Sequence, residues 1–165
     1  MADIAARLAE LGLRLPAVAA PLAAYVPAVR SGSWVWTAGQ LPFVDGALPV
    51  TGKVGLGEGL VDPQVAAALA RQSALNALAA VAALIESEGG PQGAQALSRV
   101  VRVVKVVGFV ASDPQFTGHP AVVNGASHLL GEVFGDAGVH ARSAVGVASL
   151  PMDAPVEVEI VVELA

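Results

Sequence analysis

Apolar residues recur at helical spacing in three segments, which we therefore expect to form helices. The first spans residues 3–12 and is short. The second begins at Asp62 and Pro63, because a carboxylate can cap the first turn and proline fits the first helical position, and it runs to about Glu88. The third spans residues 121–134. The side chains that these helices should bury are, in chain order, Ile4, Leu8, Leu11, Leu75, Leu78, Ala82, Ile85, Val122, Ala126, Leu129, Leu130 and Val133.

Strands are predicted where β-branched and aromatic residues dominate. Residues 34–37 form one short strand, and its two tryptophans, Trp34 and Trp36, should share one face in the core or at a subunit interface. Residues 100–110 are nearly continuous valine, which indicates a central strand buried on both faces or nearly so. The glycine-rich stretch 45–59 should be a loop, with room for a short strand pair.

The last quarter of the chain predicts a β-hairpin with charged residues on its outer face. Arg142 and Glu157 are symmetric about residues 149–151, so a turn there would make them cross-strand neighbours, with His140 and Glu159 beside them. A guanidinium next to a carboxylate can bind a small carboxylic acid and position water, although such pairs are also common as plain surface ion pairs. The opposite, buried face would contain Val145, Val147, Val156, Val158, Ile160, Val162 and Leu164.

The order of these elements predicts an α+β domain in which two long helices cover one face of a mixed sheet. Hydrophobic residues make up 55% of the 165 residues but aromatic residues only 4%, so the core must consist of small aliphatic side chains. The strand–helix units lack the G-x-G-x-x-G pattern of dinucleotide-binding proteins, so nucleotide binding has little support.

Composition narrows the classes of function further. The chain has no cysteine, which excludes disulfides and thiol catalysis, and its net charge of −5 argues against a nucleic-acid partner. Mean hydropathy is high, at +0.65. The longest uncharged helical run, residues 72–85, is nevertheless too short to cross a bilayer. Residues 1–4 do not resemble a signal peptide. We therefore expect a cytoplasmic protein without a membrane partner.

Three histidines, His119, His128 and His140, are the only residues that suggest a metal site, and no metal is expected. None of them has a partner at the spacing that zinc sites use. His119 precedes Pro120 where the third helix should begin. His140 is a candidate for the ligand site, because it shares the predicted face of Arg142.

A set of short motifs occurs in the same order and at closely similar spacings as in a known protein family. They are Tyr25-Val26-Pro27, Thr37-Ala38-Gly39-Gln40-Leu41-Pro42, Ala70-Arg71-Gln72-Ser73 with Asn76, Val103-Val104-Lys105 with Phe109-Val110, Asn124, Ala141-Arg142-Ser143 and Val156-Glu157-Val158-Glu159. Over about residues 22–163 the chain resembles the RidA (YjgF) family of reactive-intermediate deaminases.

The resemblance implies a chorismate-mutase-like α+β fold and a barrel-forming homotrimer with clefts between adjacent subunits. Proteins of this family hydrolyse small enamine and imine acids, such as 2-aminoacrylate and 2-iminobutanoate, to 2-keto acids and ammonia, without a cofactor or metal. The expected ligand is therefore a small carboxylate.

The resemblance also assigns roles to individual residues. Arg142 corresponds to the arginine that binds the substrate carboxylate, and Glu157 to the glutamate that positions or activates the attacking water. Tyr25 corresponds to the tyrosine that closes the cleft and Asn124 to the asparagine near it. Gly39 corresponds to the glycine whose backbone approaches the ligand. Without the resemblance, Tyr25 could simply pack and Asn124 could pair with nearby backbone.

Four features depart from the family pattern. Ala38 stands where the family commonly has serine, His140 where it usually has proline, and Ala144 where it frequently has cysteine. Residues 1–20 form a predicted helical extension in front of a RidA-like domain at residues 21–165. These departures leave two alternatives to a deaminase: a non-catalytic module that binds small carboxylates or regulates a partner, and, with less support, the endoribonuclease activity attributed to some relatives.

Overall fold

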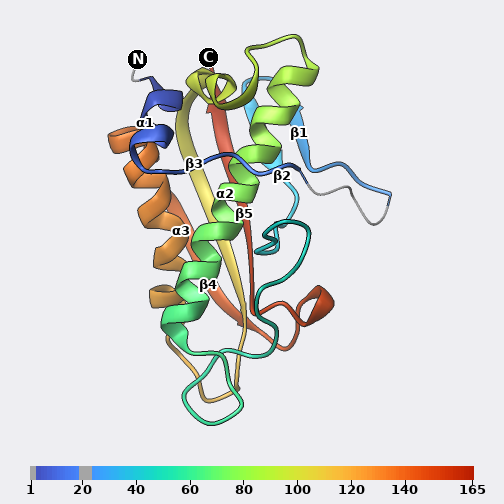
Figure 1. Ribbon diagram of the computed structural model, residues 1–165, viewed down its shortest axis with the longest axis vertical. Coiled ribbons are helices and arrows are strands. Elements are labelled where there is room, and N and C mark those ends of the chain that lie inside the picture. The colour runs from blue at the N-terminus through green and yellow to red at the C-terminus, as the bar shows by residue number, and fades with distance from the viewer. Residues whose placement is uncertain (1–2, 19–23) are drawn as a thin grey trace.

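The computed structural model describes residues 3–18 and 24–165, which form a five-stranded sheet with two long helices on one face (Figure 1). The helices are α1 (Ile4–Glu10), α2 (Pro63–Ser87) and α3 (His119–Phe134), and the strands are β1 (Ala28–Ser31), β2 (Trp34–Thr37), β3 (Val100–Ala111), β4 (Ala141–Val147) and β5 (Val156–Leu164). Short 3-10 turns cover Gly93–Arg99, Gly135–Gly138 and Pro151–Asp153. The predicted α+β class, with a mixed sheet under two helices, is confirmed.

The helices begin where the sequence predicts. Asp62 caps α2 by accepting a hydrogen bond from the backbone N–H of Gln64 at 2.7 Å, and Asp3 caps α1 through the N–H of Ala6 at 3.1 Å. Helix α2 is followed by Gly89, whose φ of 84° is a conformation that glycine adopts without strain. Helix α3 starts two residues earlier than expected, at His119.

The core lies between the helices and the sheet and is built from small side chains. Leu75, Leu78, Ala82 and Ile85 of α2 are buried, as are Val122, Ala126, Leu129, Leu130 and Val133 of α3. A Cβ on Gly125 of α3 would lie only 2.7 Å from the carbonyl carbon of Ala67 in α2. The absence of a side chain at Gly125 therefore allows the two helices to pack closely.

Helix α2 is long and apolar enough, by length and composition alone, to cross a membrane. The expectation that no segment would qualify was therefore wrong. Its 25 residues pack against the sheet and α3, and 67% of its most apolar window is buried inside the protein. We therefore assign α2 as the core helix of a small domain.

The face of the sheet opposite the helices is open. Strand β3 does not bury both faces, because one or two exposed or partly exposed residues separate its buried residues from Val100 to Val110. The prediction of burial on both faces is therefore wrong for the single chain. Trp34 and Trp36 lie on the open face with 37% and 42% of their surface exposed, and their ring centroids are 6.2 Å apart. The tryptophans share one face as predicted, but they are not in the core of the chain.

The predicted β-hairpin between residues 141 and 164 is wrong. The strand order is β1-β2-β5-β3-β4, so β3 lies between β4 and β5. Strand β4 pairs parallel with β3, because a strand–helix–strand crossover through α3 joins them, whereas β5 pairs antiparallel with both β2 and β3. The buried stripe of β5, from Val156 to Leu164, is confirmed, but Val145 on the edge strand β4 is 43% exposed and Val147 is only partly buried.

Helix α1 packs on the same core as the rest of the chain. Ile4 and Leu8 are buried, and the guanidinium Nε of Arg7 donates to the backbone carbonyl of Glu132 in α3 at 2.8 Å. The predicted boundary between residues 20 and 21 lies outside the described residues and stays a prediction. The N-terminal helix is therefore attached to α3, which also contributes to the candidate site.

Candidate functional site

Arg142 lies on edge strand β4, with its side chain directed to α3. It pairs with Val106, which is buried beneath the helices, so Arg142 is on the helix-covered side of the sheet. Its Nη1 donates to Asn124 Oδ1 at 2.7 Å and to Ser127 Oγ at 3.1 Å. Its Nη2 donates to the backbone carbonyl of Pro120 at 3.3 Å. One end of the guanidinium is thus held by α3.

His140 joins this group through Ser127. Its Nε2 lies 2.9 Å from Ser127 Oγ, and its Nδ1 lies 2.6 Å from the backbone carbonyl of Gly138. The structure therefore brings together Asn124, His140 and Arg142, three residues that the sequence analysis selected. Ser127 was missed, although its position one turn after Asn124 on the same helix was a usable signal.

Glu157 lies at the start of β5, on the open face. It pairs with Phe109 of β3 and alternates with buried Val156 and Val158. Burial raises the pKa of the Glu157 carboxyl above its usual 4.5, and the nearby charge of Glu159 raises the pKa further. A carboxyl whose pKa is moved towards neutrality is better suited to exchange protons with a substrate.

Gly39 lies beside this carboxyl, and Ala38 precedes Gly39 in the chain. Gln40 exchanges backbone hydrogen bonds with Val158 of β5, which brings the end of β2 against β5. A Cβ on Gly39 would lie 2.6 Å from Glu157 Cδ and would overlap Oε1. Glycine at position 39 is therefore required for the observed position of the Glu157 side chain. Residue 38 is alanine, so its side chain has no hydroxyl.

Within one chain, Arg142 and Glu157 do not meet. Arg142 pairs with Val106 of β3, and Val106 pairs with Ile160 of β5, so these three side chains lie on the side of the sheet that the helices cover. Glu157 is an odd number of residues from Ile160 on β5, so its side chain is on the open face. The two side chains therefore lie on opposite sides of the sheet, with β3 between their strands. The predicted cross-strand pair is wrong, and the two residues can act on one small ligand only if two chains contribute to the site.

Tyr25 belongs to neither group of hydrogen-bonded residues. It precedes β1 with 50% of its surface exposed. Nor do any three His, Asp or Glu side chains in the described parts of the chain gather where they could hold a metal ion.

Comparison with known proteins identifies the family. The model described as "YjgF/chorismate mutase-like, putative endoribonuclease" matches residues 5–164. The chain belongs to the YjgF (RidA) family. The family resemblance and the chorismate-mutase-like fold predicted from the motifs are thereby confirmed.

Other members of the YjgF family match nearly the whole chain. Protein TCP17 of Trypanosoma cruzi is 44% identical over 162 residues, which cover 98% of this chain and 94% of that protein. A crystal structure of a protein of unknown function from Agrobacterium tumefaciens has a TM-score of 0.83 and 42% identity, over 99% of this chain and 93% of that one. The "putative endoribonuclease" from Shewanella oneidensis has a TM-score of 0.86 and 32% identity, over 99% and 100% of the two chains. Because these matches cover almost every residue, the N-terminal segment is shared with these relatives.

Proposed function

We propose that this protein hydrolyses small enamine and imine acids, of the 2-aminoacrylate and 2-iminobutanoate type, to 2-keto acids and ammonia. The reaction would take place in the cytoplasm, in clefts between the subunits of a homotrimer, without a cofactor. The observation that carries the proposal is the position of Arg142. Its guanidinium is held at one end by Asn124, Ser127 and Pro120, and it has more N–H donors than these contacts use.

Arg142 would bind the carboxylate of the substrate through the remaining donors. Charge-assisted hydrogen bonds of this kind contribute about 1.5–3 kcal/mol each. A guanidinium that is already held in place loses less side-chain entropy when the ligand binds. Fixing the carboxylate also fixes the position of the neighbouring imine carbon.

Glu157 would direct the water molecule in the chemical step. The water oxygen bonds to the imine carbon, the electron pair of the C=N bond moves to nitrogen, and Glu157 accepts the proton that the water loses. The same proton is then returned to nitrogen, which gives a carbinolamine with a hydroxyl and an amino group on one carbon. The proton of that hydroxyl is carried by Glu157 to the nitrogen while the C–N bond breaks, so that ammonia leaves and the carbonyl of the keto acid forms. The raised pKa of Glu157 favours these transfers, because the group can be charged first and neutral afterwards.

A neighbouring copy would supply the second half of each site. The argument rests on the opposite faces that Arg142 and Glu157 occupy, and on the open sheet face that carries Trp34 and Trp36. In a trimer that covers this face, the Arg142 edge of one subunit would meet the Glu157 face of the next. Ala38 and Gly39 would line the same cleft as Glu157, and Tyr25, exposed before β1, would be available to close it.

The proposal is tested by generating 2-aminoacrylate and 2-iminobutanoate in situ and measuring keto-acid formation. We expect Arg142→Ala to abolish the acceleration of imine hydrolysis. The control Arg30→Ala removes a guanidinium that pairs with Glu88 outside the candidate site, and it should retain the acceleration. An unchanged rate in Arg142→Ala would contradict the mechanism. Mixing inactive Arg142→Ala and Glu157→Ala chains should restore part of the activity, since some mixed clefts would contain both residues. No recovery, under conditions where subunits exchange, would exclude a shared site.

A non-catalytic carboxylate-binding module is the alternative on the same scaffold. The methyl group of Ala38, in place of the family's common hydroxyl, favours it. In that case calorimetry would detect binding of 2-oxobutanoate, and binding would require Arg142, but no preparation would accelerate imine hydrolysis.

Endoribonuclease activity is a further alternative, because the family description and the Shewanella oneidensis structure carry that term. The net charge of −5 counts against it, since RNA binding normally uses a basic surface. RNA cleavage that survives stringent purification, and that Arg142→Ala or Glu157→Ala abolishes, would support it.

A further inference from the structure

We propose that Ser127 and His140 are positioning residues that hold the guanidinium of Arg142 ready for a ligand carboxylate. This inference rests on the proposed carboxylate-binding role of Arg142 and adds two residues that act through it. Neither needs to touch the substrate. Ser127 lies on α3 and His140 directly precedes the edge strand β4, and these two elements pack against each other.

The direction of each hydrogen bond in this group follows from the partners. The carbonyl of Gly138 can only accept, so at 2.6 Å His140 Nδ1 must carry the proton. In a neutral ring Nε2 is then an acceptor, and the donor 2.9 Å away is the hydroxyl of Ser127. This assignment of the tautomer is made from the hydrogen-bond network.

The orientation of the Ser127 hydroxyl decides what Arg142 meets. Because its hydrogen is directed to His140, its lone pairs are left for Nη1 of Arg142 at 3.1 Å. A helical serine without such a partner turns its hydroxyl to a backbone carbonyl of the preceding turn. His140 therefore orients the Ser127 hydroxyl so that its oxygen accepts a hydrogen bond from Arg142. The resulting chain of donors runs from Arg142 to Ser127, to His140 and to Gly138.

The arrangement also selects which part of the guanidinium serves the ligand. Nη1 is used by Asn124 and Ser127, and one Nη2 contact goes to Pro120. In the part of the chain that the structure describes, no acceptor takes the Nε hydrogen of Arg142. Nε and Nη2 form a fork that matches the two oxygens of a carboxylate. The positioning group thus leaves open the side of Arg142 that suits a forked contact.

The test uses 2-oxobutanoate as the probe and follows its binding by calorimetry together with imine hydrolysis. We expect Ser127→Ala and His140→Phe each to weaken binding and raise KM about threefold to tenfold, the effect of one hydrogen bond, while kcat changes little. The double variant should be little worse than either single variant, because both changes break one chain of hydrogen bonds. Ser127→Thr, which keeps a hydroxyl, should restore binding. His128→Gln is the matched control, an exposed histidine on the same helix.

A second measurement does not depend on any ligand. In the wild type, ¹⁵N NMR of the His140 ring should show the proton on Nδ1, and Ser127→Ala should reduce the preference for that tautomer. A wild-type ring protonated on Nε2 would overturn the inference. The inference would also be overturned if Ser127→Ala and His140→Phe both bound 2-oxobutanoate with wild-type affinity while Arg142→Ala did not bind it. That outcome would leave the proposed function intact. A wild-type protein that binds no 2-oxobutanoate would remove the proposed function, and with it the role given to these two residues.

Discussion

Replacing Gly39 by alanine should displace the Glu157 carboxyl while leaving the stability of the fold nearly unchanged. The new Cβ would lie 2.6 Å from Glu157 Cδ and would overlap Oε1, whereas ordinary contacts are 3.4–4 Å, so the carboxyl has to move by at least about 1 Å. The atoms that must move are the far end of a flexible side chain rather than backbone, and Gly39 is not among the glycines with positive φ. The cost to folding should therefore be below about 1 kcal/mol, since alanine also reduces the entropy of the unfolded chain.

The same displacement should be costly for the reaction. A misplacement of about 1 Å at a reacting group can reduce the rate by about 10²-fold. We therefore expect Gly39→Ala to lose about two orders of magnitude in kcat for 2-iminobutanoate hydrolysis, with a denaturation midpoint close to that of the wild type. Binding of 2-oxobutanoate should change little, because the nearest atoms to the added methyl group all belong to Glu157, whereas the ligand carboxylate would be bound by Arg142.

The control for Gly39→Ala is Gly131→Ala in α3, where an added Cβ would meet no atom within 4 Å. That variant should keep full activity and gain up to about 1 kcal/mol of stability, because alanine is the better helix former. Wild-type kcat in Gly39→Ala, with the structural shift of Glu157 demonstrated by crystallography, would refute the assignment of water positioning to this carboxyl.

Three further predictions concern stability. Gly125→Ala should destabilise the fold by about 2–3 kcal/mol in urea titrations, because its Cβ would collide with the backbone of Ala67; a wild-type midpoint would mean that α2 and α3 can separate freely. Glu157→Gln should stabilise the chain at pH 7. The folded-state pKa of Glu157 is raised, so its contribution to stability falls as pH rises from 4.5 through that pKa; equal urea midpoints of variant and wild type at pH 7 would contradict this. The pKa of Glu132 is instead lowered by its hydrogen bond to Arg71, so this pair contributes above pH 4.5 and is lost as pH falls through the folded-state pKa. Arg71→Ala should lower the free energy of unfolding by less than about 1 kcal/mol at pH 7, because the ion pair is exposed. A larger loss in urea titrations would show that the pair is more than a surface contact.

The helices could be predicted from the sequence because their signals are local. Capping by Asp62 and the apolar stripe of α3 involve residues a few positions apart, and the same holds for the alternation in β5. The face of β3 opposite the helices could not be assigned, because a run of valines has the same pattern whether one face or both are buried.

The predicted pairing of the last two strands was wrong, because strand pairing depends on competition between segments that are distant in the sequence. The symmetry of Arg142 and Glu157 about one turn assumed that consecutive strands pair, but β5 has the more regular apolar alternation and lies at the centre of the sheet. The connection between the strands holds Met152 and Asp153 in left-handed conformations and is no tight hairpin turn. Asn124 and Arg142, which were taken from the ordered motifs, and His140, which was selected from the predicted face of Arg142, nevertheless lie together in the structure. Their role in binding a ligand stays a prediction.

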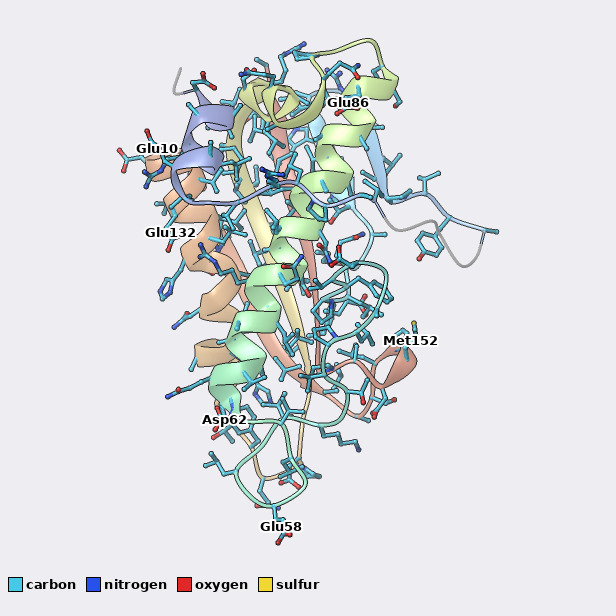
Figure 2. All side chains as sticks on the ribbon, in the orientation of Figure 1. Glu10, Glu58, Asp62, Glu86, Glu132 and Met152 are labelled. Carbon is cyan, nitrogen blue, oxygen red and sulfur yellow. The ribbon has the colours of Figure 1, made fainter. Side chains whose placement is uncertain are left out.

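Figure 2 draws the side chains of the described residues on the ribbon. The two tryptophans of the chain are both on β2, side by side on the open face. Intrinsic fluorescence excited at the red edge of the absorption band therefore reports on that face alone and not on the helix-covered core. Far-ultraviolet circular dichroism, in contrast, follows α2 and α3. A dilution or urea series recorded with both probes would distinguish uncovering of the sheet from loss of the helices, with no label attached to the protein.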